Sequence, residues 1–534
     1  MVGPTLQSVA RLRTEEPAVP AGIAGRAAVL GVVAMVLSAI GSWIPSLWGD
    51  EGTSVMSAQR SIPSLLRMLG NVDAVHGLYY GGLHAWVDVF GASPFSVRFP
   101  SAIAVGLLTA AVVLIVHELR DDRLAVVAGI VCAVLPRVTY MGEEARSYAF
   151  SAAIAAWAAW VLVRILTGRS DGKRWWWAYT GLLALGIWTF MFSVLLLAVH
   201  ATVVLASRPG RAVLRRWALA AGTAVVLASP VIVFGLLERG QVAFLAHRTT
   251  ITFKSLTVGL WFTSVPFALL AWALILIAVL AAAVPAVRAW AGRTQSDAVR
   301  TTGPTAIAAP MVTPTTTRTG PSLVLLGAAW LVLPTTILVL ASAVHPMFSG
   351  RYMSYSAPAA AILMACGIAW LAERVRRPTV ISAVAVVVVL IAAAPVWASQ
   401  RTPYAKNNSD WAEISATIGA RAVPGDAIVF DESARPSQRP RLAEHTYPEG
   451  FRNVRDVTLQ IPYARSTTWR DTAMTPARAA ALGRFAGVDR VWLVEYATPT
   501  HTDTYGMEDL EDLGFRPGVE VRTHRSVIRE YVRS

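Results

Sequence analysis

Long runs of hydrophobic residues recur over the first 400 positions of the chain and alternate with short polar segments. Runs such as Ala27–Ile40, Phe267–Val284 and Ser382–Ala394 contain no charged side chain. A helix needs about 20 mostly apolar residues to cross the hydrocarbon layer of a membrane. The pattern therefore predicts a multi-span α-helical membrane protein with about 11 transmembrane helices, at 27–47, 101–117, 124–140, 147–164, 175–190, 191–207, 217–235, 267–287, 322–343, 355–372 and 379–398.

Clusters of Arg and Lys between the runs indicate the orientation of the spans, because these residues accumulate in cytoplasmic loops. Six clusters begin at Arg11, Arg120, Arg164, Arg208, Arg288 and Arg374. If all six face the cytoplasm, the N-terminus is cytoplasmic and the odd number of spans puts the C-terminus outside the cell. The loops then expected to face outside are Gly49–Pro100, Met141–Arg146, Glu238–Pro266 and His345–Tyr355.

The pattern also divides the chain into domains. We expect a cytoplasmic segment at 1–26, a transmembrane module at 27–398 and an extracytoplasmic α/β domain at 399–534. Within the module, 49–100 forms the first outer loop, and 294–321, rich in Thr, Pro and Ala, is predicted to be a flexible cytoplasmic linker. In the last part, helical patterns such as Asp410–Ile418 alternate with short strand-like runs such as Ala427–Phe430, which favours a small α/β domain.

Composition supports the membrane interpretation and argues against a nucleic-acid-binding protein and against a disulfide-rich or metal-binding protein. Only 15% of residues are charged, against about 25% in soluble domains. The net charge of +14 is explained by cytoplasmic loops, so we expect no nucleic-acid partner. The two cysteines, Cys132 and Cys366, lie inside apolar runs and predict neither a disulfide framework nor a metal site.

The first candidate for chemistry is the acidic pair Asp50-Glu51, directly after the first predicted span. A carboxylate at the outer membrane boundary could take a proton from an acceptor hydroxyl as a general base. The alternative is that both acids are solvated interface residues without a chemical role.

A second group lies at the outer end of the third predicted span, where Glu143, Glu144, Arg146 and Tyr148 follow one another closely. The Arg146 guanidinium suits phosphate oxygens, and Arg351, before a later span, is a second candidate cation for a lipid phosphate. One alternative is that Glu144 and Arg146 pair with each other. The other is that the Arg351 side chain only snorkels to the membrane–water interface.

The first outer loop adds Asp73, His76 and Tyr80. A His near a carboxylate could orient an acceptor or contact a phosphate, whereas Tyr at this depth is also a common interface anchor. All these candidates fall on the predicted outer face, which suits a substrate with a charged head and a lipid tail.

Four sequence segments resemble the GT-C superfamily of membrane glycosyltransferases, in the branch of aminoarabinose transferases, lipopolysaccharide-core transferases and protein O-mannosyltransferases. They are Trp48-Gly49-Asp50-Glu51, His76–Tyr80 followed by Arg98–Ala102, Glu144–Tyr148, and Arg351-Tyr352. The resemblance covers about residues 25–400. Within it, the segment Asp73–Gly77 (Asp-Ala-Val-His-Gly) resembles that of actinobacterial members labelled mannosyltransferases.

This resemblance implies a polyprenyl-phosphate sugar donor, inversion at the anomeric carbon and no metal or other cofactor. It implies Asp50 as the general base with Glu51 as its rival, and Arg146 and Arg351 as ligands of the donor phosphate. Asp73, His76, Tyr80, Glu143, Glu144 and Tyr148 would line the substrate pocket. Many relatives carry a Pro-Pro pair after the residue equivalent to His76, where this chain has Gly77-Leu78. The acceptor, which could be a glycan, a lipid or a protein, is not specified, and mannose is the favoured sugar.

Two other functions fit the pattern of spans. A secondary transporter would also carry charges at membrane depth, but such proteins show paired halves and interrupted helices, and no internal repeat is visible here. A non-catalytic membrane scaffold that presents the C-terminal domain to a partner is the second alternative, and it would not require Asp50.

Overall fold

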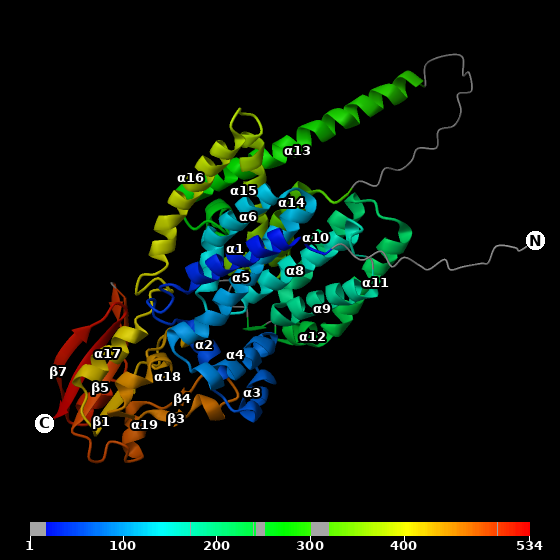
Figure 1. The fold of residues 1–534 in the computed structure, drawn as a ribbon. Helices are drawn as coiled ribbons and strands as arrows, with labels where there is room; N and C mark the ends of the chain where they lie inside the picture. The colour runs from blue at the N-terminus through cyan, green and yellow to red at the C-terminus, as the bar shows by residue number, and fades with distance from the viewer. Residues whose placement is uncertain (1–17, 171, 239, 242–250, 301–319, 499) are drawn as a thin grey trace, which may run out of the picture.

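A computed structural model describes residues 18–170, 172–238, 240–241, 251–300, 320–498 and 500–534. The chain forms a bundle of long helices, with a C-terminal domain built on a β-sheet at one end (Figure 1). Most of the predicted cytoplasmic segment 1–26 lies outside the described residues, and the first helix begins at Ala21.

The bundle consists of helices, most of which contain a long apolar stretch. They are α1 (Ala21–Ala39), α5 (Pro94–Leu119), α6 (Asp122–Val134), α7 (Pro136–Gly142), α8 (Tyr148–Leu166), α9 (Lys173–Thr189), α10 (Leu196–Ala206), α11 (Arg211–Leu227), α12 (Ser229–Leu237), α13 (Val265–Arg300), α14 (Leu323–Val344), α15 (Ala357–Ala372) and α16 (Pro378–Ser399). Short 3-10 turns lead into two of them, η2 (Met191–Leu195) before α10 and η5 (Gly350–Ser356) before α15. Helix α13 projects beyond the bundle, away from the C-terminal domain (Figure 1).

The multi-span helical fold is confirmed, and length and composition support seven to nine of the roughly eleven predicted spans within the described residues. Among the described residues, seven helices are long and apolar enough to cross a membrane, or nine if two bent pairs each count as one span. The two remaining predicted spans are shorter. Helix α9 has 17 residues, a length of about 26 Å at 1.5 Å per residue, and Met191–Ala206 is shorter still. The first turn of α9 also contains Lys173 and Arg174, so the apolar part of α9 is shorter than the helix itself.

Proline accounts for both bends. Helices α6 and α7 meet at 59° around Leu135-Pro136, and α11 and α12 meet at 52° beside Pro230. Proline disfavours helical geometry in the residue before it and removes a backbone donor, so the helix restarts at a new angle.

The predicted linker at 294–321 is only partly described. Its first residues continue α13 as far as Arg300, and 301–319 lie outside the described residues. The domain boundaries stay a prediction.

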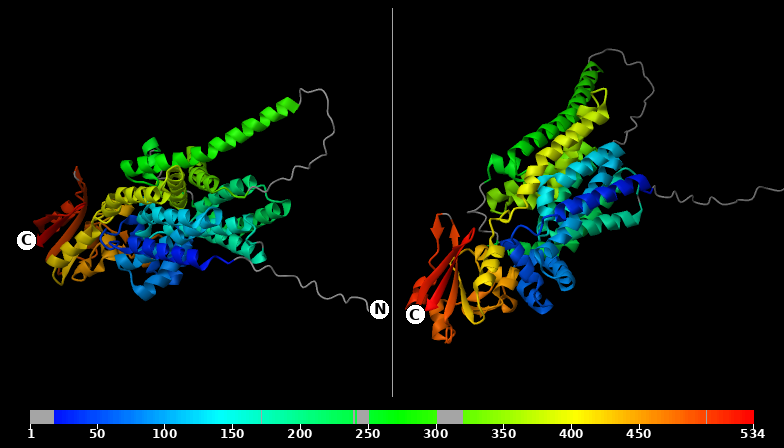
Figure 2. Two further views of the ribbon diagram at one scale, coloured as in Figure 1. Left: turned by 45° about the horizontal axis from the view of Figure 1, so that its top comes forward. Right: turned by 60° about the vertical axis from the view of Figure 1, so that its left-hand side comes forward.

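The first outer loop folds into short helices at the end of the bundle that faces the C-terminal domain (Figures 1 and 2). These are α2 (Gly49–Ala58), α3 (Ile62–Leu69), η1 (Ala74–His76) and α4 (Gly77–Phe90). Two acids in the first turn of α2, Asp50 and Glu51, suit the positive end of its helix dipole.

The C-terminal domain has a mixed sheet in the order β2-β1-β5-β8-β7, with β6 paired to β5. Its strands are β1 (Asp426–Phe430), β2 (Val454–Asp456), β5 (Arg490–Thr498), β6 (His501–Thr502), β7 (Phe515–Arg522) and β8 (Ser526–Arg533), and β3 (Leu459–Ile461) pairs with β4 (Thr472–Ala473) separately. Strand β1 is parallel to β2 and β5, whereas β8 is antiparallel to both neighbours. Helices α17 (Trp411–Arg421), α18 (Leu442–Thr446), α19 (Pro476–Ala481) and α20 (Met507–Asp512) complete the domain, which confirms the predicted alternation.

One hydrophobic core joins the first outer loop to the C-terminal domain. Val55, Met56 and Tyr80 from the loop belong to the same buried cluster as Trp411 and Phe430. The Tyr447 hydroxyl also accepts a hydrogen bond of 2.8 Å from the Leu47 amide. The domain is therefore packed against the loop as part of one folded unit.

Candidate functional site

A cavity of about 1160 Å³ lies where the bundle, the first outer loop and the C-terminal domain meet. Its charged and hydrogen-bonding wall includes Asp50, Asp73, His76, Arg146, Glu238 and Arg351. Its apolar wall includes Val194, Leu195, Ile232, Leu236, Ile337, Leu338 and Ala341. The third wall comes from the C-terminal domain and includes Arg435, Pro436, Ser437, Gln438, Thr468, Trp469 and Arg470.

Asp50 reaches this cavity from the first turn of α2. Its carboxylate Oδ2 lies 2.5 Å from Nη1 of Arg351, and the two side chains are 21% and 25% exposed. The Arg351 guanidinium also stands over the ring of Trp48, 5.3 Å from its centroid. The sequence predicted these two residues on one face, and the structure brings them into contact.

Arg146 lies in the segment between α7 and α8 and is held by the same outer loop. Its Nη1 lies 3.3 Å from the Asp50 backbone oxygen, 3.3 Å from Ser54 Oγ and 3.4 Å from the Tyr80 hydroxyl. Within the described residues the Arg146 guanidinium contacts these groups and His76, and it does not pair with the Glu144 carboxylate, which was the alternative. Arg146 and Asp50 thus share the cavity wall.

His76 is the acceptor of a hydrogen bond from Arg146, with 3.2 Å between His76 Nε2 and Arg146 Nη2. A guanidinium only donates, so the ring must be neutral with its proton on Nδ1. Burial, and then the positive charges of Arg146 and Arg351, lower the pKa of His76 well below its usual value. The His76 ring that lines the cavity is therefore uncharged.

Asp73 lies beside His76 and accepts a hydrogen bond of 3.1 Å from the Tyr80 hydroxyl. Burial raises its pKa, against the opposing effect of Arg146. Its backbone has a φ of 61°, in the left-handed region that residues other than glycine seldom adopt. This is the strained position at the entrance of η1, and it turns the Asp73 carboxylate into the cavity wall.

Glu51 points away from the cavity although it is the neighbour of Asp50. Its carboxylate forms a bidentate pair with Arg98, at 2.7 Å and 2.6 Å, and accepts the Ala145 amide at 2.9 Å. Both charged side chains are fully buried. Arg98 in turn donates to the backbone oxygens of Ser42 and Pro45. Glu51 is therefore placed as a structural anchor, and it does not line the cavity.

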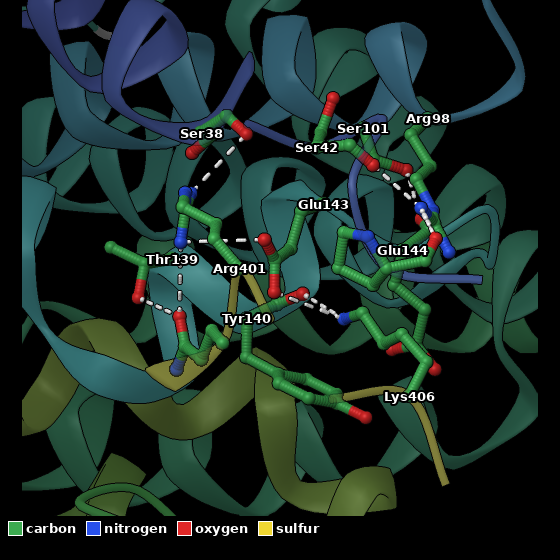
Figure 3. A network of polar contacts seen from close by, with 12 residues as sticks. Ser38, Ser42, Arg98, Ser101, Thr139, Tyr140, Glu143, Glu144, Arg401 and Lys406 are labelled. Carbon is green, nitrogen blue, oxygen red and sulfur yellow. Dashed lines mark hydrogen bonds and ion pairs between the residues drawn. The ribbon is translucent and has the colours of Figure 1, made fainter. Parts of the chain in front are cut away.

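Glu143 is likewise buried, in a network that ties the end of α7 to the chain that follows α16 (Figure 3). Lys406 Nζ and Arg401 Nη1 each lie 3.3 Å from one of its carboxylate oxygens. Lys406 also lies over the ring of Tyr140, 3.4 Å from its centroid. Burial raises the pKa of Glu143, and the two cations oppose that shift. Glu143 thus fixes the segment between α16 and the C-terminal domain against the end of α7.

Glu144 and Tyr148 are buried beside the site but do not line the cavity. The Glu144 backbone oxygen accepts hydrogen bonds from Ser101 Oγ at 2.7 Å and from the Arg146 amide at 2.8 Å. This tight turn fixes the direction of the Arg146 side chain. Of the predicted pocket residues, Asp73 and His76 line the cavity, while Tyr80 supports it through Asp73 and Arg146.

Sequence reasoning missed the third wall completely. Arg435, Trp469 and Arg470 belong to the C-terminal domain, more than 380 positions after Asp50. No periodicity or motif connects segments so far apart, and only the basic residues Arg435 and Arg470 in turn-like stretches of sequence hint at a surface role. The buried partners Arg98, Arg401 and Lys406 were also not predicted. The prediction of a metal-free site stays a prediction.

Residues 83–234 match the family model described as dolichyl-phosphate-mannose-protein mannosyltransferase. In fold, the chain is similar to ArnT from Cupriavidus metallidurans in the apo state, with a TM-score of 0.52 at 12% identity, over 95% of this chain and 98% of that one. It is similar to the same enzyme bound to undecaprenyl phosphate, with a TM-score of 0.53 at 13% identity, over 94% and 97% of the two chains. No functionally curated protein matches the sequence significantly. Residues 83–234 thus match the mannosyltransferase family model, and the chain as a whole shares the fold of ArnT, a multi-span helical bundle with a C-terminal domain.

Proposed function

We propose that this protein transfers a sugar, with mannose favoured, from a polyprenyl-phosphate donor to a cell-envelope acceptor with inversion. One observation carries the proposal: the Asp50 carboxylate and the guanidinium groups of Arg146 and Arg351 line one cavity that also has an apolar wall. The family description supports a lipid-phosphate-linked mannose, and the similar ArnT structure contains undecaprenyl phosphate.

The two walls of the cavity suit the two halves of such a donor. Ile232 and Leu236 on α12 face the cavity, as do Ile337 and Leu338 on α14. These side chains offer an apolar surface for prenyl units, and their burial against lipid is favourable in proportion to the area removed from water. Arg146 and Arg351 offer planar guanidinium donors that match phosphate oxygens. The sugar between them would then lie beside Asp50.

The reaction follows from this arrangement. The acceptor hydroxyl oxygen attacks the anomeric carbon on the face opposite the phosphate, and its proton passes to the Asp50 carboxylate. The bond between the anomeric carbon and the phosphate oxygen breaks, and its electron pair leaves with the polyprenyl phosphate. Arg146 and Arg351 stabilise the charge that develops on the leaving phosphate.

The ion pair between Asp50 and Arg351 gives the donor a second role. A phosphate that binds Arg351 competes with the Asp50 carboxylate for the same guanidinium. Donor binding would therefore release Asp50 from its 2.5 Å contact and make it available as the base. Asp50 would then be free to accept the acceptor proton when the donor is in place.

The neutral His76 and the Asp73–Tyr80 pair position Arg146 for its role. His76 and Tyr80 both contact the guanidinium, so its fork is held toward the cavity. In the cell, we propose that this site faces outside, with a cytoplasmic N-terminus and an extracytoplasmic C-terminal domain, as the Arg and Lys distribution predicts.

Replacing the proposed base tests the chemistry directly. Asp50→Asn keeps the shape of the side chain but cannot take the acceptor proton. We expect it to lower the turnover of polyprenyl-phosphate mannose by about 10²- to 10⁴-fold, the usual contribution of a general base. The purified protein should bind undecaprenyl phosphate at least as tightly as the unaltered protein, because the neutral side chain no longer competes as a charged partner for Arg351. Intrinsic tryptophan fluorescence measures this affinity.

Asp88→Asn is the matched control. Asp88 belongs to the same outer loop, its side chain is 64% exposed and it does not line the cavity. We expect its turnover to be close to that of the unaltered protein. An Asp50→Asn enzyme with full activity would disprove the role of Asp50.

A further inference from the structure

The cavity wall formed by the C-terminal domain is positively charged. It includes Arg435 and Arg470, and none of its described lining residues is an acid. Both arginines are exposed, and no ion pair or side-chain hydrogen bond is recorded for either within the described part of the chain. All the acids that line the cavity, among them Asp50 and Asp73, come from the membrane module instead.

The segment that carries Trp469 and Arg470 is held firmly at the cavity. On one side, Arg60 donates to the backbone oxygens of Ser466, at 3.0 Å, and Thr468. On the other side, the Asp471 carboxylate lies 2.6 Å from His445 Nε2 and 2.6 Å from the Tyr463 amide. Residues 463–471 are therefore anchored both to the outer loop and to their own domain.

The segment that carries Arg435 is held next to the proposed base. Residues Pro436–Gln438 form the 3-10 turn η6 directly after Arg435. A Cβ atom on Gly49 would lie 2.4 Å from the backbone oxygen of Ser437, so this turn sits against the start of α2, one residue from Asp50. The cationic wall thus begins where the acceptor hydroxyl must arrive.

We propose that Arg435, Trp469 and Arg470 form the acceptor subsite, and that the acceptor is a saccharide that carries an anionic group, a phosphate or a carboxylate. This inference rests on the proposed function. The phosphate of the donor is assigned to Arg146 and Arg351, so the second pair of cations is available to another ligand. Guanidinium forks bind phosphate and carboxylate oxygens in the same way. Trp469 offers a flat apolar face and one N–H donor, which suits the surface of a sugar ring.

The test measures binding to the purified full-length protein by ligand-observed NMR titration. The probes are mannose 6-phosphate, glucuronic acid and neutral mannose. We expect the two anionic sugars to bind more tightly than mannose, by about fivefold for two exposed charge contacts. The double variant Arg435→Gln with Arg470→Gln should lose this preference. Arg465→Gln, on the same exposed segment but outside the cavity lining, should keep it.

Undecaprenyl phosphate separates this inference from the proposed function. The double variant should keep the unaltered affinity for undecaprenyl phosphate, whereas Arg146→Gln should weaken it. If the unaltered protein does not bind undecaprenyl phosphate, the proposed function fails, whatever the sugars do. An anion preference that survives in the double variant, that disappears in Arg146→Gln instead, or that is absent from the unaltered protein would overturn the acceptor subsite.

Discussion

At the scale of single residues, the two adjacent carboxylates of α2 have different surroundings. Asp50 faces the cavity and is 21% exposed, while Glu51 is completely enclosed with Arg98. Neighbours in a helix point about 100° apart, so one side chain can line a cavity while the next enters the core. The sequence singles out the two acids together as candidates, but only the packing shows that Asp50 lines the cavity while Glu51 is buried against Arg98.

This difference predicts separate effects for the two acids. Glu51→Gln leaves the Arg98 guanidinium buried without its counter-charge, and the loss of one partner of a buried pair costs about 3–5 kcal/mol. We expect a clear fall in the apparent melting temperature of the purified protein, measured by light scattering during a thermal ramp. Asp50→Asn is the comparison, since its partly exposed site should leave the melting temperature nearly unchanged. A Glu51→Gln protein with unchanged stability but no activity would instead assign Glu51 to the chemistry.

His76 predicts a dependence on pH. Its pKa is lower in the folded chain than in the unfolded one, chiefly because of burial and then because of Arg146 and Arg351. The folded state then binds fewer protons at acidic pH, so stability falls as the pH drops below about 6.5, by at most about 1.4 kcal/mol for each pH unit.

The measurement compares melting temperatures of the unaltered protein and His76→Gln between pH 7.5 and 5.5. Glutamine keeps an acceptor for Arg146 but does not titrate, so the acidic loss due to His76 should disappear from its profile. The acids with raised pKa, such as Asp73 and Glu143, contribute to both profiles and cancel in the difference. Identical pH profiles would contradict a neutral, buried His76.

At the scale of elements, the close contact between α2 and η6 brings the C-terminal domain next to Asp50, the proposed base. Gly49→Ala places a methyl group 2.4 Å from the Ser437 oxygen, so one of the two elements must move. A displacement of about 1 Å at a reacting centre can cost on the order of 100-fold in rate. We expect kcat/KM for sugar transfer to fall by about tenfold or more, while undecaprenyl phosphate affinity changes little.

Gly82→Ala is the control for this variant, since Gly82 lies in α4 and a Cβ there meets nothing within 4 Å. Alanine favours a helix over glycine by about 1 kcal/mol, so this change should be neutral or mildly stabilising. Equal activity of the two variants would show that the approach of η6 does not matter for transfer.

The elements themselves were largely predictable because hydrophobic runs report directly on helices that cross a membrane. Each predicted span corresponds to a helix or a bent pair in the structure, although α9 and the segment Met191–Ala206 are shorter than the others. The turn η6 was not predictable. Its position depends on a close contact with Gly49, and local sequence carries no signal for a contact across nearly 390 residues.

At the scale of the whole molecule, three of the loops that were predicted to share a face meet at one cavity, to which they contribute Asp50, Arg146 and Arg351. The participation of the C-terminal domain could not be inferred, since it depends on pairs such as Glu143 with Lys406 and Arg60 with Thr468. These pairs link positions more than 260 residues apart and follow no periodic pattern. Charge alone also could not separate buried anchors such as Arg98 from cavity-lining residues such as Arg146.

The shared core of the first outer loop and the C-terminal domain has a consequence for biosynthesis. The loop ends near residue 100, but its packing partners start near Trp411. At about 5–20 residues per second, a ribosome needs roughly 15–60 seconds to add the intervening chain. During that interval Val55, Met56 and Tyr80 lack their final neighbours, so a newly inserted chain holds an incomplete site until translation is nearly over. Under the proposed function, an unfinished chain would therefore lack the cavity wall that carries Arg435 and Arg470.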